Sequence, residues 1–396
     1  MKFNSTSYIQ ELIDSASVTG GEAVIPQGVY VCGTIFLKDN VILNLQKGAV
    51  ILGSTDPDDY SENVDIFYDG CGLPRGKALI YADGVKNVRI YGGGTVNGRG
   101  AQHKYDTRPF LVRLKNCSDV QIDGIFLQDG AAWNLHIMDC DRVSINKVTI
   151  KSHANHNNDG IDIDASRDVT VSDCLIDTGD DAVCLKATVD KPCRNITVRG
   201  CTLSSKAAAI KMGTESVGDF ENVEIADIFV HDTYGCAVKI VPVDGANVKD
   251  VNIRNIRVEN TVGPIFIANG ERMRGYHNMP PRKTAGCIDG VSICTVTGNC
   301  ITPINKNTLS CICISGTVKN PVRNISLSDI ELEMPGGAES YEPFEIPEMG
   351  DNYPEYYSFG ILPAWGLYTR HTENLTVEDI TLTQKAHDVR PMIRND

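Results

Sequence analysis

A short β-like motif recurs along the chain at nearly constant spacing, and this recurrence limits the possible folds more than any other feature. Each copy reads Asn or Asp, an aliphatic residue, a polar residue and a second aliphatic residue. Copies begin at Asn87, Asp119, Asp168, Asn195, Asn222, Asp250, Asn324 and Asn374, with a variant at Arg142. By subtraction, the copies between positions 119 and 250 follow one another every 23–28 residues. A fixed period of this length indicates a solenoid or an array of repeats.

The content of each repeat predicts the kind of solenoid. A unit holds two or three alternating β-rich stretches separated by Gly, Asp or Asn, without an amphipathic helical run. Alternation places every second side chain inside. Three strands in about 25 residues make one coil of a parallel β-helix, with coils stacked about 4.8 Å apart. A β-propeller blade would need roughly 40–50 residues, and a β-sandwich would not keep this register. We therefore predict an all-β parallel β-helix solenoid, with residues 1–396 as a single domain.

Three segments depart from the repeat. Residues 1–20 contain the stretch Ser7–Asp14, which predicts a short helix that caps the open N-terminal end of the solenoid. Residues 270–284 are basic and contain proline, and residues 335–363 are rich in Glu, Tyr and Pro. Insertions in solenoids become loops on one face, which is often the binding face. We predict that both segments are such loops.

Composition excludes some classes of function. The formal net charge of −14 opposes nucleic-acid binding. The longest apolar run is too short to span a membrane. The first residues lack the basic, apolar and small-residue pattern of a signal peptide. These features predict a cytoplasmic protein, or a secreted or periplasmic one if a signal was removed.

The chain has 14 cysteines, and several of them recur at one position of the repeat. Cys117, Cys140, Cys174 and Cys201 all stand just before or after a predicted strand. Small, apolar thiols are well suited to the inside of a narrow solenoid. We predict an internal ladder of buried, reduced cysteines.

Three aspartates are the candidate catalytic residues. Asp159 follows a pair of asparagines, and Asp180 and Asp181 are adjacent 21 and 22 residues later. This is slightly less than one repeat, so stacking of the coils would bring the three carboxylates together. Carboxylates that repel one another raise at least one pKa, and a protonated carboxylic acid beside ionised ones is what hydrolysis of a glycosidic bond requires. Asp is also a common turn residue, but the adjacent pair one repeat after Asp159 favours an active site.

Four motifs in fixed order resemble those of glycoside hydrolase family 28, the polygalacturonase-like enzymes. They are Arg108–Leu111, Trp133–His136, Asn157–Asp162 and Gly179–Ala182. The resemblance implies a right-handed parallel β-helix and inverting hydrolysis. It implies that Asp180 is the general acid and that Asp159 and Asp181 hold and deprotonate the attacking water. An inverting acid and base are separated by roughly 6.5–9.5 Å, which leaves room for that water.

The chain departs from the family on the substrate-binding side. The position of the family's histidine is Ala208, and its Arg-Ile-Lys reads Ala237-Val238-Lys239, so only the lysine remains. Lys186, Lys211 and Lys239 are 25 and 28 residues apart, about one coil each. In register they would form a cationic ladder that binds carboxylate groups of the substrate.

Four further residues complete the predicted substrate-binding set. Asn157 lies in the first aspartate motif, and Glu215 lies where the family usually has Gly-Ser. Arg370 and His371 follow the aromatic insertion at 335–363, where they would border a pocket that blocks one end of the groove. A blocked groove favours attack at a chain end.

These features together predict a glycoside hydrolase that cleaves α-linked galacturonic acid or rhamnogalacturonan-type pectic oligosaccharides, acting from a chain end. Its partner is an acidic oligosaccharide, with no cofactor and no metal. Two alternatives stay open. A Ca²⁺-dependent β-helix similar to pectate lyases is one, because three close aspartates can bind Ca²⁺. A non-catalytic carbohydrate-binding β-helix is the other, since the family's histidine and arginine are missing. The sequence predicts no oligomeric state.

Overall fold

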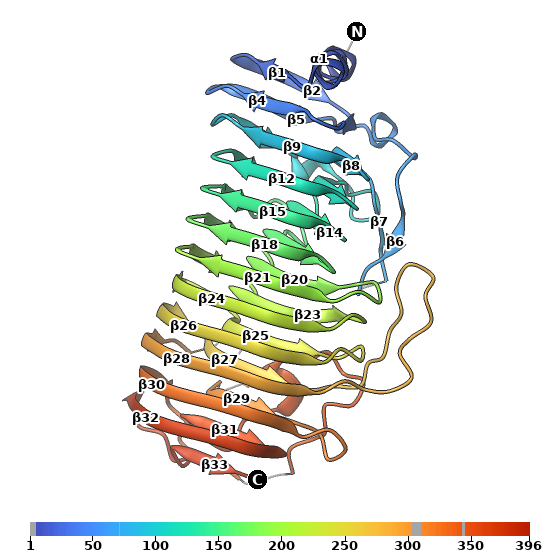
Figure 1. The fold of residues 1–396 in the computed structure, drawn as a ribbon. Helices are drawn as coiled ribbons and strands as arrows, with labels where there is room; N and C mark the ends of the chain where they lie inside the picture. The colour runs from blue at the N-terminus through green and yellow to red at the C-terminus, as the bar shows by residue number, and fades with distance from the viewer. Residues whose placement is uncertain (1–4, 71, 303–309, 343–344) are drawn as a thin grey trace. The chain divides into compact units, whose positions relative to one another are not determined.

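The computed structural model describes residues 5–70, 72–302, 310–342 and 345–396. The chain divides into two compact units, residues 1–184 with 196–201 and residues 185–195 with 202–396. Parallel β-strands build both units, and Figure 1 shows their labels along the chain. The single-domain organisation of residues 1–396 stays a prediction.

The first unit is a stack of coils with three short strands each. Strands β3 (Ile35–Phe36), β8 (Ala78–Asp83), β11 (Phe110–Lys115), β14 (Leu135–Met138) and β17 (Ile161–Asp164) form one parallel sheet in chain order. The remaining strands of its coils are β1 (Glu22–Ile25), β2 (Gly28–Cys32), β4 (Ile42–Leu45), β5 (Ala49–Gly53), β9 (Lys86–Tyr91), β10 (Thr95–Asn97), β12 (Ser118–Asp123), β13 (Phe126–Gln128), β15 (Asp141–Asn146), β16 (Thr149–Ser152), β18 (Arg167–Ser172) and β19 (Leu175–Thr178). One antiparallel hairpin, β6 (Phe67–Tyr68) and β7 (Pro74–Arg75), and two short 3-10 helices, η1 (Pro57–Asp59) and η2 (Gly100–Gln102), lie between coils in the sequence. These coils are those of the predicted right-handed parallel β-helix.

The second unit keeps the coil but fuses two of its strands into one long strand. Its long strands are β24 (Phe220–His231), β26 (Val248–Thr261), β28 (Ile288–Cys300), β30 (Val322–Gly336) and β32 (Thr372–Ala386), which pair in chain order. Its short strands are β22 (Thr202–Ser205), β23 (Ile210–Ser216), β25 (Cys236–Pro242), β27 (Gly263–Ala268), β29 (Ile312–Ser315), β31 (Leu367–Arg370) and β33 (Ile393–Asn395), with one 3-10 helix, η3 (Tyr356–Phe359). Strands β20 (Val183–Ala187) and β21 (Cys193–Arg199) contain residues of both units.

The backbone explains why the repeat begins with Asn or Asp. The first residue of every motif copy has a φ between 51° and 57°, in the left-handed region that Asn and Asp tolerate better than most residues. Some of these side chains also bond along the stack, as Asn222 Nδ2 does to Asn195 Oδ1 at 2.8 Å. One further copy of the motif begins with Gly290 instead of Asn or Asp, so the sequence pattern did not include it. Gly290 has a φ of 90°. Val291 of that copy pairs with Val251 and Ile325 in neighbouring coils.

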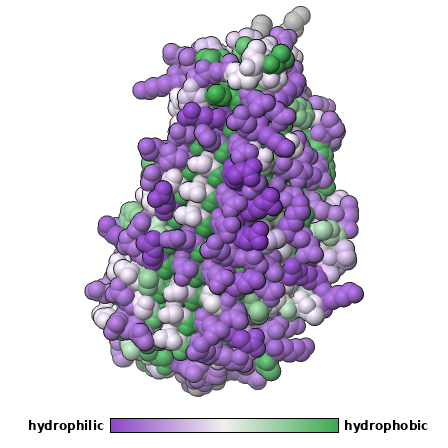
Figure 2. All heavy atoms as spheres, in the orientation of Figure 1, coloured by the Kyte–Doolittle hydropathy of each residue, from purple (hydrophilic) through white to green (hydrophobic). Residues whose placement is uncertain are grey.

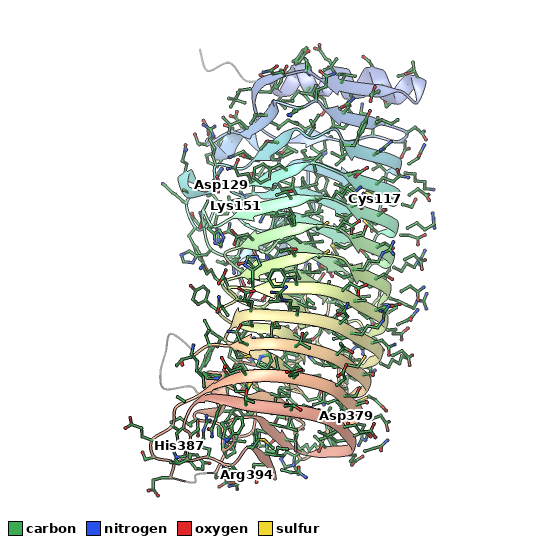
Figure 3. The ribbon with its side chains drawn as sticks, turned by 90° about the vertical axis from the view of Figure 1, so that its left-hand side faces the viewer. Cys117, Asp129, Lys151, Asp379, His387 and Arg394 are labelled. Atoms are coloured by element: carbon green, nitrogen blue, oxygen red, sulfur yellow. The ribbon has the colours of Figure 1, made fainter. Side chains whose placement is uncertain are left out.

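The described cysteines are free thiols, in agreement with the predicted ladder, but they form two stacks instead of one. Cys117 donates its backbone N–H to Sγ of Cys140 at 3.4 Å, at the turn before β12 and β15. Cys174 and Cys201 contact each other at the turn before β19 and β22. A coil has several corners, so residues that look equivalent in a linear repeat occupy different ones. Figure 3 shows Cys117 on the side opposite Asp129 and Lys151, whose backbones are joined by a hydrogen bond of 3.1 Å.

Helix α1 (Thr6–Thr19) is the predicted N-terminal cap. It buries Ile9, Ile13 and Ala16. The side chain of Gln10 binds the backbone of Phe36 as a neighbouring strand would. Its Oε1 accepts the N–H of Phe36 at 2.9 Å, and its Nε2 donates to the carbonyl of Phe36 at 3.0 Å. The open edge of the first coil is thereby covered. Residues 1–4 of the predicted cap lie outside the described residues.

The two predicted insertions lie between strands of the second unit. Residues 270–284 precede β28. Of the predicted insertion 335–363, residues 335 and 336 are the end of β30, and the rest of its described part contains η3 as its one regular element. Residues 343 and 344 lie outside the described residues. Among the described residues, no helix is long and apolar enough to cross a membrane. The visible surface is mostly hydrophilic (Figure 2), as expected when aliphatic side chains fill the coils.

Candidate active site

Two of the three predicted catalytic aspartates are stacked in neighbouring coils of the first unit. Gly160 N donates to Asp181 O at 2.8 Å and Ile161 N to Ala182 O at 2.9 Å, which places Asp159 level with Asp181. Side-chain oxygens of both aspartates and Sγ of Cys184 lie within 4.8 Å of one another. Asp159 is 3% and Asp181 is 2% exposed. The structure therefore brings together two buried carboxylates that the sequence separates by 22 residues.

Asp180 is placed differently from this pair. It is partly exposed, and its Oδ1 accepts the backbone N–H of Asp181 at 3.0 Å. Thr178 donates its hydroxyl to the backbone carbonyl of Asp180 at 2.7 Å, which holds the turn. Asn157 Nδ2 approaches Asp180 Oδ2 at 3.5 Å, at the long end of hydrogen bonding. Asn157 was predicted to bind substrate, and the structure places it against the predicted general acid.

The Asn157–Gly160 motif is explained by the turn that it forms. Asn157 has a φ of 52°, and the side chain of Asn158 is tied to Gly130 O at 2.6 Å and to Asn155 N at 3.0 Å. A Cβ on Gly160 would lie 2.3 Å from Ala182 O in the next coil. Only glycine permits this close approach, so the motif sets the separation of Asp159 and Asp181.

Asn157 is held by two buried arginines. Neither of them was among the site residues predicted from the sequence. Arg75 Nη2 and Arg108 Nη2 both donate to Asn157 Oδ1, at 3.2 and 3.0 Å. With its oxygen bound in this way, the amide presents its N–H₂ group toward Asp180. Arg108 was visible in the first family motif, whereas Arg75 belongs to the β6–β7 hairpin and had no sequence signal beyond a local Arg-Gly-Lys.

The stacked pair and Cys184 also form a possible metal-ligand set. Two carboxylates and one thiol lie close enough to contact one ion. Ca²⁺ prefers six to eight oxygen ligands, so a thiol in third place does not fit it well. The set fits a softer divalent ion better. The expectation that the reaction uses no metal stays a prediction.

The second unit contains a buried network of charges that includes two predicted substrate-binding residues. Lys186 Nζ lies 3.2 Å from Glu215 Oε2, and both side chains are at least nine-tenths buried. Burial alone would raise the pKa of Glu215, but Lys186, Arg272 and Lys211 around it hold that pKa well below its ordinary value. Arg272 in turn binds Asp244 at 2.6 Å. Glu215 is therefore a counter-ion inside a cationic cluster.

Lys211 and Lys239 are in register on β23 and β25, as the predicted ladder requires. Both are nearly buried, and both contact the 335–363 insertion. Lys211 Nζ donates to the hydroxyl of Tyr353 at 3.0 Å, and Lys239 forms a close ion pair with Glu355. Burial alone would lower the pKa of Lys239, but Glu355 raises it above its ordinary value. Sequence reasoning missed both partners, since a loop of unknown path gives no contact to infer. Substrate binding by these lysines stays a prediction.

Arg370 and His371 hold the same insertion. Arg370 is 4% exposed and donates to Ile346 O at 2.7 Å and to Pro347 O at 3.0 Å. His371 Nε2 lies 3.0 Å from Glu348. Their contacts with the loop are structural, and the predicted role at the rim of a pocket stays a prediction. Ala208 and Ala237, at the family's histidine and arginine positions, are buried beside β23 and in β25.

Comparisons with known proteins identify the family of this chain. The sequence model of the glycosyl hydrolases family 28 matches residues 70–347. A probable polygalacturonase of Vitis vinifera is 25% identical over 350 residues, covering 82% of this chain and 70% of its own. An exo-poly-alpha-D-galacturonosidase of Dickeya chrysanthemi is 25% identical over 319 residues, covering 65% and 52%. The crystal structure of an exopolygalacturonase from Thermotoga maritima superposes with a TM-score of 0.73 at 20% identity, covering 95% and 88%. The family model spans more than half of the chain and includes all three aspartates, so this protein belongs to glycosyl hydrolases family 28.

Proposed function

We propose that this glycoside hydrolase cleaves α-linked galacturonate residues from the ends of pectic oligosaccharides, with inversion at the anomeric carbon. The observation that carries the proposal is the pairing of Asp159 with Asp181, beside a separately held Asp180. Two carboxylates whose oxygens lie within 4.8 Å can bind one water between them. A third carboxyl group that is held apart and partly exposed can reach the glycosidic oxygen.

The mechanism uses the three groups in one displacement. Asp180 donates its proton to the oxygen of the leaving sugar as the glycosidic bond breaks. Asp159 and Asp181 orient a water on the opposite face of the ring and accept its proton as the new C–O bond forms. Asn157, held by Arg75 and Arg108, positions the Asp180 carboxyl group. No covalent intermediate is formed.

The relatives support the substrate class. The Vitis vinifera relative is a probable polygalacturonase, and the Dickeya chrysanthemi relative is an exo-poly-alpha-D-galacturonosidase. Lys186, Lys211 and Lys239 supply positive charge in a chain of net charge −14, and an acidic substrate needs such local charge. We infer that one terminal acidic sugar is recognised, instead of a long polyanion.

The test is hydrolysis of oligogalacturonides of defined length, with product anomers followed by ¹H NMR. The first product should be the β-anomer, and removal of single units should precede internal cleavage. An initial α-anomer would indicate a nucleophile and a carboxylate separation near 5 Å instead. Rapid appearance of mid-length fragments from long polygalacturonate would contradict the exo mode.

The Asp180→Asn variant tests the assignment of the acid. It should fold normally and lose at least about 10³-fold in kcat, because acid catalysis contributes roughly 10²–10⁴. Asp177→Asn, which changes a half-exposed aspartate paired with His153, is the matched control and should keep its activity. Normal turnover by a folded Asp180→Asn protein would exclude Asp180 as the acid.

A further inference from the structure

A pocket in the first unit is lined by Arg75 and Arg108, the two arginines that hold Asn157. It has a volume of about 230 Å³ and is formed by three segments around the β6–β7 hairpin. Its lining includes Pro57, Ile66 and Pro74 as apolar groups and Arg75, Lys77 and Arg108 as cations. Pockets for drug-sized ligands occupy roughly 300–1,000 Å³. A volume below that range suits one sugar ring and not an oligosaccharide chain.

Arg75 is the built feature of this pocket. Its side chain is 1% exposed, and its Nε binds Asp69 at 2.6 Å while its Nη2 binds Asn157 at 3.2 Å. Among the described residues, its Nη1 has no hydrogen-bond partner. A guanidinium has five N–H donors, and Nη1 is not among the fully enclosed, unpartnered polar atoms of the described residues, so it is accessible to a ligand. Because Arg75 lines the pocket, a ligand there can accept these remaining hydrogen bonds.

The other polar groups of the pocket select the kind of ligand. Lys77 forms an ion pair with Glu62, and Asp106 and Thr107 also line the walls. Donors and acceptors together match the hydroxyl groups of a sugar, whereas the two carboxylates oppose a bare inorganic anion. The prolines and Ile66 can pack on the C–H face of a ring. A sugar with one carboxylate uses all of these groups.

The pocket is also connected to the proposed general acid. Arg75 and Arg108 both line it, and both bind the amide oxygen of Asn157, whose Nδ2 lies 3.5 Å from Asp180. One side chain therefore separates the arginines from the acid. The pocket is therefore linked to Asp180 through Asn157.

We propose that this pocket is a subsite for one uronate unit of the substrate, with its carboxylate on Arg75 Nη1 and Lys77 Nζ. The inference rests on the proposed function for the identity of the substrate. It adds that the β6–β7 hairpin, and not the catalytic coils, recognises a sugar beyond the cleaved bond.

The experiment measures binding in the Asp180→Asn protein by isothermal titration calorimetry, so that no turnover interferes. The probes are D-galacturonate, D-galactose and inorganic phosphate. Galacturonate should bind at least about ten-fold more tightly than galactose, since hydrogen bonds to charged groups are strong. Lys77→Gln should weaken galacturonate binding about ten-fold, and Arg75→Lys at least as much. Arg142→Gln, which removes an exposed arginine of the same unit, should leave it unchanged.

The outcomes separate the subsite from the hydrolase activity. If galacturonate binds and Lys77→Gln weakens it, the pocket stands even when the wild type hydrolyses no pectic oligosaccharide. If the wild type hydrolyses oligogalacturonides but Lys77→Gln changes neither galacturonate binding nor KM, the inference is wrong. Equal binding of phosphate and galacturonate would also overturn it, because a plain anion site would then suffice. Lys77 is partly exposed, so this variant keeps the test valid if Arg75→Lys does not fold.

Discussion

The aspartate site of the first unit and the lysine network of the second unit handle charge in opposite ways. Asp159 and Asp181 are like charges, buried with their oxygens within 4.8 Å of each other and of a thiol. Lys186 and Lys239 are buried against opposite charges, Glu215 and Glu355. Two carboxylates held close together repel one another when both are ionised, whereas oppositely charged side chains attract. Neutralising one carboxylate should therefore have opposite consequences in the two regions.

The largest expected effect concerns the aspartate site. Asp181→Asn should reduce kcat by about 10²–10⁴-fold, because the water loses part of its base. The free energy of unfolding should stay the same or rise, since the variant removes repulsion between two buried carboxylates. Urea denaturation and steady-state kinetics on the same preparation measure both. A strongly destabilised variant would show that the pair supports folding, in contradiction to the expected difference between the two regions.

The next effect concerns the lysine network. Glu215→Gln should lower the free energy of unfolding at pH 7 by about 3–5 kcal/mol, because it leaves Lys186 and Arg272 short of a buried counter-ion. Glu221→Gln, which breaks an exposed pair with Lys249, is the matched control and should cost at most about 1 kcal/mol. If both variants lose the same free energy of unfolding, Glu215 does not act as a stabilising buried counter-ion.

The pH dependence of that difference gives a separate prediction. The pKa of Glu215 is lower in the folded protein than its ordinary value of 4.5, so its contribution to stability is present above pH 4.5 and is lost as pH falls through the folded pKa. The gap in unfolding free energy between wild type and Glu215→Gln should therefore be constant above that pH and shrink below it. Denaturation curves between neutral and acid pH measure the gap. If the difference in unfolding free energy instead grows at acid pH, the pKa of Glu215 is not lowered by folding.

A smaller effect tests whether the network also binds substrate. Lys239→Ala should raise KM for an acidic oligosaccharide by about ten- to a hundred-fold, because hydrogen bonds to charged groups are strong. It should change KM much less for a neutral substrate of the same length. Glu355→Gln leaves Lys239 without its counter-ion and should shift KM for the acidic substrate in the opposite direction. If neither variant changes KM, Lys239 serves only to hold the 335–363 insertion.

The smallest expected effect is that of a chelator. EDTA should leave kcat unchanged, and no unsaturated product absorbing in the ultraviolet should appear, since the proposed displacement uses only carboxylates and water. Restoration of lost activity by Ca²⁺ would favour the alternative of an enzyme similar to pectate lyases. Restoration by a softer ion would instead implicate Cys184 with the two aspartates.

The repeat in the sequence was sufficient to predict the coils and the stacking of Asp159 on Asp181. Each of these follows from local chemistry, because Asn and Asp mark the left-handed residue of each coil and alternation marks its interior. The search failed at Gly290, where a glycine serves the same backbone need without the expected side chain. The sequence also predicted one ladder of cysteines where the structure has two stacks, because spacing alone does not distinguish the corners of a coil.

The fold and the stacking of the candidate carboxylates Asp159 and Asp181 were thus predictable from the sequence, since both depend on a period that the coils repeat. Only the tertiary structure decided the partners of the charged residues. Tyr353 and Glu355 reach the lysines from an insertion more than a hundred residues away, and Arg75 reaches Asn157 from a hairpin 82 residues earlier. Such contacts follow from the path of irregular loops, which no periodic pattern encodes. The positions of the candidate carboxylates are therefore readable from the repeat, whereas the contacts of the lysines and of Asn157 depend on the segments that interrupt it.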